Sequence, residues 1–442
     1  MPRLLTLGCA LVFTTTLAQP ASESQYEGNL PIDHPAIQYD EVSPHDPVAR
    51  LAAQIDAGTA TLDASGRASD RLASLLRLLD ISTDTQGLVF SKTSVQHPRI
   101  SPRNPRAIYF NDEVAVGFVR GSDVIELAAL DPRQGVRFYT LEARTPDRPV
   151  ISRRTECLRC HQGPATIGVP GFFVTSVFPA ASGTPDPSGA IVTDHRTPFA
   201  DRWGGWYVTG THGDQRHRGN AVARNPAEPT VLEADGTQNL TSLAGRFDPE
   251  GYLTASSDIV ALMTFEHQTR MTNLLTRLGW EARIAEHAAA TEAARGARLA
   301  ARVEEVVRYL LFVDEAPFLA PITGVSTFRR TFPQRGPRDR QGRSLRAFDL
   351  QRRLFRYPLS YGVYSSAFDA LPTGIRAQVC RRLYDVLSGA DRSPAFAPLS
   401  STDRTTILEI LRETKPNLPA YFRTQHAGAA ARGTGRRPAA PA

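Results

Sequence analysis

The pentapeptide Cys157-Leu158-Arg159-Cys160-His161 holds the side chains best suited to chemistry in this 442-residue chain. Two thiols separated by two residues can reach the two vinyl groups of one porphyrin and add across them as thioethers. The histidine that follows the second thiol is then held under the iron, where an imidazole nitrogen binds it. We therefore predict one covalently bound haem c, attached through Cys157 and Cys160, with His161 as the proximal iron ligand.

Thiol redox chemistry, zinc binding and chance are the alternatives for this motif. A thiol–disulfide redox motif lies at the N-terminus of a helix in a βαβ unit, whereas strand-like segments precede this one. A structural zinc site needs a second Cys/His pair at short spacing, and the sequence has none. Chance occurrence is disfavoured because the whole chain has only 4 cysteines. Haem attachment therefore remains the main prediction.

The ligand on the other side of the iron has candidates on a long helical segment. Met263, His267 and Met271 are spaced by four residues, which places all three on one face of a helix. His267 is the preferred distal ligand, and Met271 comes next. The alternative is an ordinary core stripe with a hydrogen-bonded histidine.

A second group of candidates lies in the segment 193–220, which is rich in histidine, arginine and tryptophan. Tryptophans suit the edge of a haem, arginines suit its propionates, and glycines allow close approach to a flat ligand. The alternative is a surface loop whose Asp–Arg pairs are structural. His212 and His217 are kept as further distal candidates, and the segment also holds His195, Arg196, Arg202, Trp203, Trp206 and Arg216.

The N-terminus has the layout of a secretory signal. Arg3 precedes an apolar run from Leu4 to Leu17, and small residues end at Ala18, after which we predict cleavage. The run is too short to span a bilayer comfortably, and no other segment approaches that length. The sequence therefore predicts an exported, periplasmic protein without an integral membrane segment once the signal is removed. Haem c is matured outside the cytoplasm, so the signal and the motif support each other.

Cysteine usage and charge exclude other classes. Losing the signal removes Cys9 and leaves three cysteines, which excludes a disulfide framework; Cys380 is expected to be a core residue. The formal net charge is +6, but only two of the 51 basic residues are lysines. The arginines are scattered among acidic residues rather than gathered in one stripe, so no nucleic-acid partner is expected.

Hydrophobic periodicity predicts an α+β fold: a central antiparallel β-rich, haem-bearing domain with a helical C-terminal half. Strands of period two are expected between 87 and 208, with the pentapeptide between the fourth and fifth of the seven predicted strands. Helices are expected over 47–81, from 257 to about 312, over 345–355, after Pro372 and over 401–414. The predicted organisation is a signal peptide (1–18), a leader with N-terminal helices (19–86), a β-rich haem c domain (87–256), a helical domain (257–426) and a disordered tail (427–442).

The segment Cys-Leu-Arg-Cys-His-Gln-Gly at 157–163 resembles the c-type cytochromes. The resemblance is local, and it implies attachment at Cys157 and Cys160 and ligation by His161. In small cytochromes the motif lies on an N-terminal helix and a ligand methionine follows some tens of residues later. Here strands precede the motif and the next methionine is Met263. A looser resemblance is to bacterial sensors with a c-type haem on a PAS-like sheet, and the wider chain is similar to exported bacterial cytochrome-like proteins.

Three functions fit a single haem. The first, which we favour, is electron transfer to or from a redox partner protein, with a filled distal position. The second is a haem-based sensor of gas or redox state. The third is a redox enzyme with an open distal site that takes a small-molecule ligand, polarised by histidine and arginine side chains.

Overall fold

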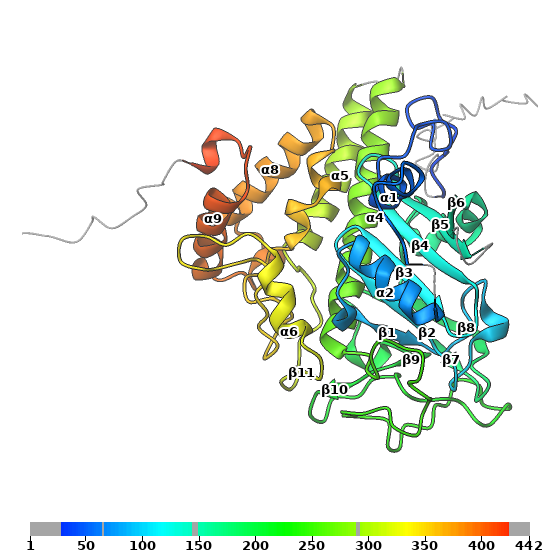
Figure 1. Ribbon diagram of the computed structural model, residues 1–442. Coiled ribbons are helices and arrows are strands. Elements are labelled where there is room, and N and C mark those ends of the chain that lie inside the picture. The colour runs from blue at the N-terminus through cyan, green and yellow to red at the C-terminus, as the bar shows by residue number, and fades with distance from the viewer. Residues whose placement is uncertain (1–27, 64–65, 144–148, 289–291, 424–442) are drawn as a thin grey trace, which may run out of the picture.

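The chain folds as an α+β protein in the computed structural model, which describes residues 28–63, 66–143, 149–288 and 292–423. A seven-stranded sheet, antiparallel throughout, forms one side of the molecule, and most of the helices belong to the C-terminal half (Figure 1). This confirms the predicted fold class. The predicted signal peptide (1–18) and tail (427–442) lie outside the described residues.

The strands are β1 (Gly87–Val89), β2 (Arg106–Phe110), β3 (Val114–Val119), β4 (Val124–Asp131), β5 (Gly135–Ala143), β6 (Pro149–Arg153), β7 (Thr175–Pro179), β8 (Pro185–Val192), β9 (Trp206–Tyr207), β10 (Gly210–Thr211) and β11 (Thr323–Gly324). The α-helices are α1 (Pro47–Asp56), α2 (Ala68–Leu78), α3 (Leu158–His161), α4 (Ile259–His287), α5 (Glu292–Leu310), α6 (Phe328–Thr331), α7 (Ser366–Asp369), α8 (Thr373–Leu387) and α9 (Ser401–Thr414).

The large sheet is a meander in the order β6-β5-β4-β3-β2-β1-β9, and β7 and β8 form a separate hairpin. Strands β2, β3, β4 and β5 were predictable because apolar runs rich in strand-forming residues are separated there by short Gly, Asp, Asn and Pro turns. The sequence pattern missed β1 and β6. β1 has only three residues and all three are buried, so it shows no alternation. All five residues of β6 are half-buried, which likewise leaves no periodic signal.

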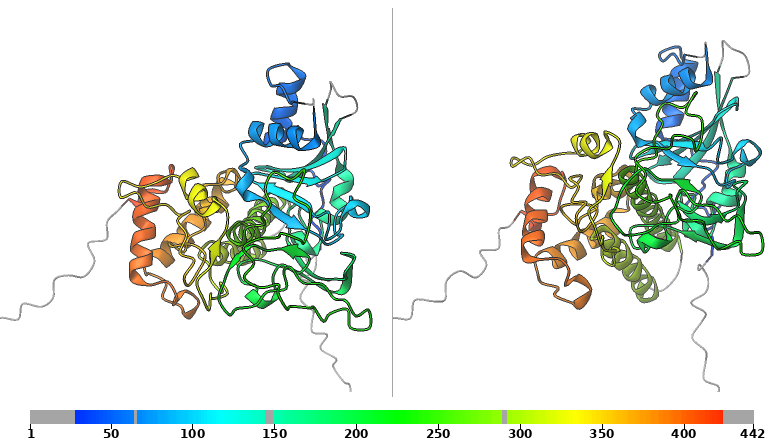
Figure 2. Two further views of the ribbon diagram at one scale, coloured as in Figure 1. Left: turned by 60° about the horizontal axis from the view of Figure 1, so that its bottom comes forward. Right: turned by 90° about the horizontal axis from the view of Figure 1, so that it is seen from below.

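The two faces of this sheet are covered differently. On one face, α1 and α2 pack against the strands, and the predicted leucine stripe of α2 (Leu72, Leu75 and Leu76) is buried there. On the other face lie α4 and the segment that carries the pentapeptide. Figure 2 shows α1 and α2 on the side of the sheet away from α4.

Helix α4 links the sheet to the helical half. Its N-cap is Asp258, whose side chain accepts hydrogen bonds from the backbone N–H groups of Val260 and Ala261. One hydrophobic core contains α4 together with Phe110 and Leu130 of the sheet and residues of α5, α8 and α9. The core therefore runs across the domain boundary predicted at 256/257.

The helix predicted over 345–355 is wrong. Asp349 accepts hydrogen bonds from the backbone N–H groups of Gln351 and Arg352, at 2.9 and 2.8 Å, and Leu350 adopts a left-handed conformation with φ of 59°. Such local side-chain bonds compete with helical ones. The segment instead turns back on itself, and the rings of Phe348 and Phe355 stack with centroids 5.3 Å apart.

Among the described residues, no helix combines the length and the apolar character needed to cross a bilayer.

Candidate functional site

The pentapeptide lies at the outer edge of the large sheet. Strand β6 ends at Arg153, a single 3₁₀ turn covers Thr155–Cys157, and α3 follows directly. Leu158 packs between two apolar clusters, whereas Cys160 is exposed and Cys157 is half-buried. The leucine therefore anchors a short helical turn that leaves both thiols within reach of the surface.

The imidazole of His161 is held in one orientation. Its ring lies between Phe138 of β5 and Phe173, with centroid distances of 4.7 and 4.9 Å. Nδ1 lies 3.0 Å from the carbonyl oxygen of Gly171, and the backbone N–H of Gly171 donates to the His161 carbonyl at 2.9 Å. Burial lowers the pKa of His161, so the neutral imidazole donates from Nδ1 and keeps a lone pair on Nε2. Among the described residues, Nε2 has no hydrogen-bond partner.

Helix α4 positions the carbonyl that orients His161. The side chain of Asn273 accepts from the Phe172 N–H at 3.1 Å and donates to the Phe172 carbonyl at 2.6 Å. A Cβ at residue 171 would lie 2.2 Å from Asn273 Oδ1, so a larger residue there would displace the Asn273 side chain from its hydrogen bonds to Phe172. A backbone carbonyl that fixes the tautomer of a histidine is the usual support for a metal-ligating imidazole.

The environment of Cys157 does not favour thiol redox chemistry. Burial, followed by the charges of Glu156 and Glu126, raises the pKa of Cys157 to about 11. Reactive CxxC thiols instead have a lowered pKa; Cys157 is the N-cap of α3, but that helix has only four residues and does not offset the burial of the thiol. The donor set does not favour zinc either, since no three His, Cys, Asp or Glu side chains converge anywhere in the described part of the chain.

Beside the pentapeptide, the sheet presents a floor of small residues. Strand register places Ala115 opposite Ala128, and Ala128 opposite Phe138, on the face that carries His161. Both alanines and Cys157 pack against the cluster formed by Phe138 and Phe172. We call the face formed by Ala115, Gly117, Ala128, Phe138 and Thr140 the sheet platform; its alanines are only half-buried.

Two arginines lie along the sheet platform. Arg106 pairs with Glu126 and lies so close over Gly117 that a Cβ there would meet its guanidinium at 2.5 Å. Its Nε is buried without a hydrogen-bond partner. Arg154 pairs with Glu142 and donates to Thr140 at 2.8 Å. A floor of small residues suits a flat apolar group, whereas both bordering guanidinium groups are already paired with glutamates and offer a further carboxylate only a shared contact.

The structure does not bring His267 or Met271 to the pentapeptide. The ring of His267 is fully buried, with Nδ1 2.8 Å from Nδ1 of His195 and Nε2 2.7 Å from Oγ of Ser360. Met271 packs at Gly362 of the helical half, and Met263 lies in the same core. Asn273, which faces the pentapeptide segment, follows Met271 by two residues and so lies on the other side of α4.

His212 and His217 lie together in a buried group with Phe199 and Trp203. Nδ1 of His212 is 2.7 Å from the Gln215 carbonyl, and its Nε2 accepts from the Asn239 N–H at 3.1 Å. The two histidine rings are 4.7 Å apart, and burial lowers the pKa of His217 to about 3. Within the described part of the chain, the ring contacts of this pair stay inside the group.

The arginines of the segment 193–220 serve the fold. Arg202 is buried and faces Glu266 at 3.4 Å, while Arg196 pairs with Asp194 at 2.6 Å and Arg218 pairs with Asp201. Arg216 is exposed. The arginines beside the pentapeptide are instead Arg106 and Arg154, which the sequence did not single out. The sequence feature that could have indicated them is their place at strand ends: Arg106 begins β2 and Arg154 follows β6.

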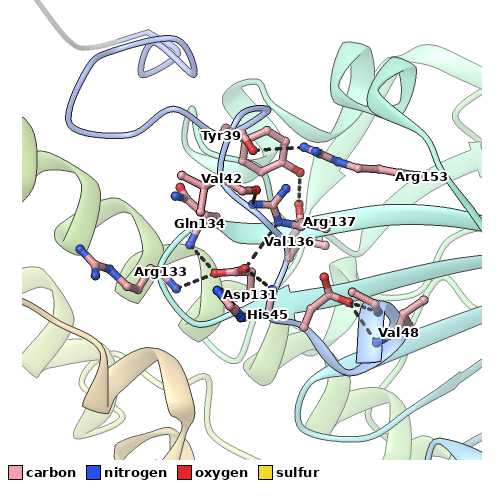
Figure 3. A network of polar contacts seen from close by, with 12 residues as sticks. Tyr39, Val42, His45, Val48, Asp131, Arg133, Gln134, Val136, Arg137 and Arg153 are labelled. Carbon is pink, nitrogen blue, oxygen red and sulfur yellow. Dashed lines mark hydrogen bonds and ion pairs between the residues drawn. The ribbon is translucent and has the colours of Figure 1, made fainter. Parts of the chain in front are cut away.

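The sequence likewise gave no sign of the N-terminal strap, as we call residues 28–46. Asn29 donates to the Gln162 carbonyl at 3.0 Å, and Gln162 donates back to the Leu30 carbonyl at 2.7 Å. Further along, the Tyr39 ring lies between the guanidinium groups of Arg137 and Arg153, at 5.0 and 5.2 Å (Figure 3). The strap thus fastens the residue after His161 to the turn between β4 and β5.

Comparison of the chain with known protein families, with curated proteins and with solved structures finds no match.

Proposed function

We propose that this protein is an exported c-type haem protein that carries one haem on Cys157 and Cys160 and transfers electrons. The observation that carries the proposal is the His161 imidazole, neutral and oriented by Gly171, with Nε2 left available. Haem c maturation outside the cytoplasm and the secretory signal favour a periplasmic location. The physiological partner is then a redox protein.

The residues of the chain have distinct tasks in this proposal. Cys157 and Cys160 would hold the haem covalently, and the haem supplies one-electron redox chemistry when bound. His161 would bind the iron, with the Gly171 carbonyl fixing its tautomer. Phe138 and Phe173 exclude water from the imidazole. Arg106 and Arg154 are the cations nearest the sheet platform, but each already pairs with a glutamate, so a propionate would have to share the guanidinium with Glu126 or Glu142.

The proposal is tested by expressing the full chain together with a haem-attachment system. Purified protein is run on a denaturing gel stained for covalent haem, and its visible spectrum is recorded oxidised and reduced. We expect a stained band for the wild type and for Cys380→Ala, which changes a buried thiol of α8. The Cys157→Ala/Cys160→Ala double variant should lose the band. His161→Ala should keep covalent haem and change the spectrum. A colourless, unstained wild type would overturn the proposal.

One observation favours a second candidate, a haem-based sensor or redox enzyme with an open distal position. Both ring nitrogens of His267 and of His212 already have hydrogen-bond partners inside the protein. Neither histidine can serve as an iron ligand without breaking those bonds. Adding carbon monoxide, nitric oxide or peroxide separates the candidates: a high-spin spectrum that shifts on addition supports a sensor or enzyme, whereas an unchanged low-spin spectrum supports an electron carrier.

A further inference from the structure

A cleft lies near the edge of the sheet that is opposite the pentapeptide. Its volume is about 790 Å³, within the range of small-molecule sites. It opens between the end of β1, strand β9 and the loop-rich segment 209–256. Because β6 and β9 are the two outer strands of the seven-stranded sheet, this cleft is separate from the pentapeptide.

Two cations of the cleft have no acidic partner among the described residues. Arg103 donates to the Gly245 carbonyl at 2.8 Å, and Arg246 donates to the carbonyls of Asn220 and Gly236 at 3.2 and 2.6 Å. Neither guanidinium lies within ion-pair distance of a carboxylate in that part of the chain. A backbone carbonyl holds a guanidinium in place without neutralising its charge, so both remain sites for an anion.

The other charges of the cleft leave a positive balance. Arg224 is neutralised by Glu233 at 2.6 Å, and Asp235 is the remaining acidic residue of the lining. Arg103 and Arg246 both act on Tyr207, lowering a phenol pKa that burial otherwise raises. Arg103 bonds the carbonyl of Gly245, the residue directly before Arg246, so the two unneutralised arginines are neighbours in the lining of the cleft.

Apolar residues line one part of the cleft, beside the polar side chains of Asn220 and Thr237. Phe90 and Tyr207 pack with ring centroids 4.8 Å apart, and Pro102, Ala181, Val222 and Leu232 complete the apolar part. Ligand sites commonly combine such surface with a few convergent charged groups. We propose that this cleft binds a small organic carboxylate with an apolar body, the carboxylate on Arg103 and Arg246 and the body against the apolar lining.

Isothermal titration of the mature protein with 2-naphthoate tests the proposal. Two comparison probes separate the contribution of the charge from that of the apolar rings. 2-Naphthamide has the same rings without a charge, and inorganic phosphate has a charge without the rings. We expect 2-naphthoate to bind at least about tenfold more tightly than either, since a charge-assisted pair and apolar burial each contribute about that factor. Equal binding of naphthamide or of phosphate would overturn the proposal.

Single-residue variants test whether Arg103 and Arg246 are the residues that bind the carboxylate. Arg103→Gln should weaken 2-naphthoate binding about tenfold, as should Arg246→Gln, whereas Arg352→Gln, which changes an arginine with an 81% exposed side chain, should leave binding unchanged. Arg246 also fastens two loops, so Arg246→Lys and a circular dichroism spectrum separate loss of charge from loss of fold. Unchanged binding by Arg103→Gln would overturn the assignment. The Cys157→Ala/Cys160→Ala variant should bind as the wild type does, which keeps this proposal independent of the haem.

Discussion

At the scale of single residues, the site depends on a chain of small contacts that end at one ring nitrogen. Asn273 holds Phe172, Phe172 fixes the position of Gly171, and the Gly171 carbonyl orients His161. The sequence indicated His161 because its spacing from two cysteines has a chemical meaning. It could not indicate Asn273, since an asparagine 112 positions away carries no local pattern and only the packing of α4 brings it there.

Replacing Asn273 by alanine tests this chain of contacts. The change removes two buried hydrogen bonds and leaves the Phe172 backbone groups unpaired, so we expect a loss of about 2–4 kcal/mol in the free energy of unfolding. Urea denaturation followed by circular dichroism measures it. Asn225→Ala is the matched control, because Asn225 is exposed and bonds only within its own loop. Its effect should stay within about 0.5 kcal/mol. Equal stabilities of the two variants would contradict the prediction.

A buried carboxyl group predicts a pH dependence. Burial raises the pKa of Glu266 to about 7, opposed by Arg202 and by the hydroxyl of Thr193, which donates at 2.6 Å. Because this folded-state pKa lies above the ordinary value of 4.5, the stability contribution of Glu266 is fully present below pH 4.5 and is lost as pH rises towards and through 7.

The glutamine in Glu266→Gln cannot ionise, so the stability of this variant should not fall in the way that ionisation of Glu266 lowers the stability of the wild type. Between pH 4.5 and pH 8, the stability of the wild type should fall relative to Glu266→Gln by up to about 3 kcal/mol. Glu315, whose pKa burial also raises to about 7, contributes equally to both proteins and cancels. Thermal unfolding at several pH values gives the measurement. A difference between the two proteins that does not change with pH would show that Glu266 does not titrate in this range.

At the scale of elements, the helices and strands that the sequence predicted correctly are those with a clear sequence pattern. Strands β2–β5 were predictable from apolar runs bounded by turn residues, and α4 from its length and its Asp258 start signal, although α4 is buried on nearly every side and shows no single apolar stripe. The segment 345–355 has a helical spacing of leucines, but Asp349 binds its own downstream backbone instead. The N-terminal strap looked like an extended leader because its docking contacts are with distant residues, such as Arg137 and Gln162, and its local hydrogen bonds form short irregular turns without a periodic pattern.

Substitutions of Tyr39 should show how much the docked strap contributes to the free energy of unfolding. Its hydroxyl donates to the Val136 carbonyl at 2.6 Å, and its ring is buried against Trp280 and two guanidinium groups. Tyr39→Phe removes one hydrogen bond and should cost about 1 kcal/mol of unfolding free energy. Tyr39→Ala also opens a cavity and should cost about 3–5 kcal/mol.

Limited proteolysis of the same two variants supplies a local readout. If the strap docks as described, Tyr39→Ala should be cut within residues 28–46 well before Tyr39→Phe is. Equal cleavage rates and equal stabilities of both variants would place Tyr39 outside the docked strap.

At the scale of the whole molecule, one core joins the parts that the sequence separated. Residues of the sheet, of α4 and of α8 belong to the same hydrophobic cluster, although the composition changes from β-like to helical at about 256. Composition reports local structure, and it contains no information about which buried faces meet. The class of fold was therefore predictable, while the way its halves share a core was not.

Sharing a core predicts joint unfolding. We expect differential scanning calorimetry of the mature chain to show one transition in which the sheet and the helical half melt together. A chain truncated after residue 256 lacks α4, which contacts Phe110 and the Phe172 backbone, and should not show the sheet's cooperative melting. Two separate transitions in the full chain, or a folded truncated chain, would contradict the prediction.

Under the proposed export, the position of the strap has a consequence for the order of assembly. Asn29 contacts Gln162, a partner 133 residues further along the chain, so the strap must wait for a long stretch of chain to follow it. Until then the strap has nothing to dock on. The pentapeptide consequently emerges unobstructed, and the strap closes beside it afterwards, when the β4–β5 turn has also formed. An affinity tag for studying haem attachment therefore belongs at the C-terminus, since one at the mature N-terminus would join the chain just upstream of this late contact.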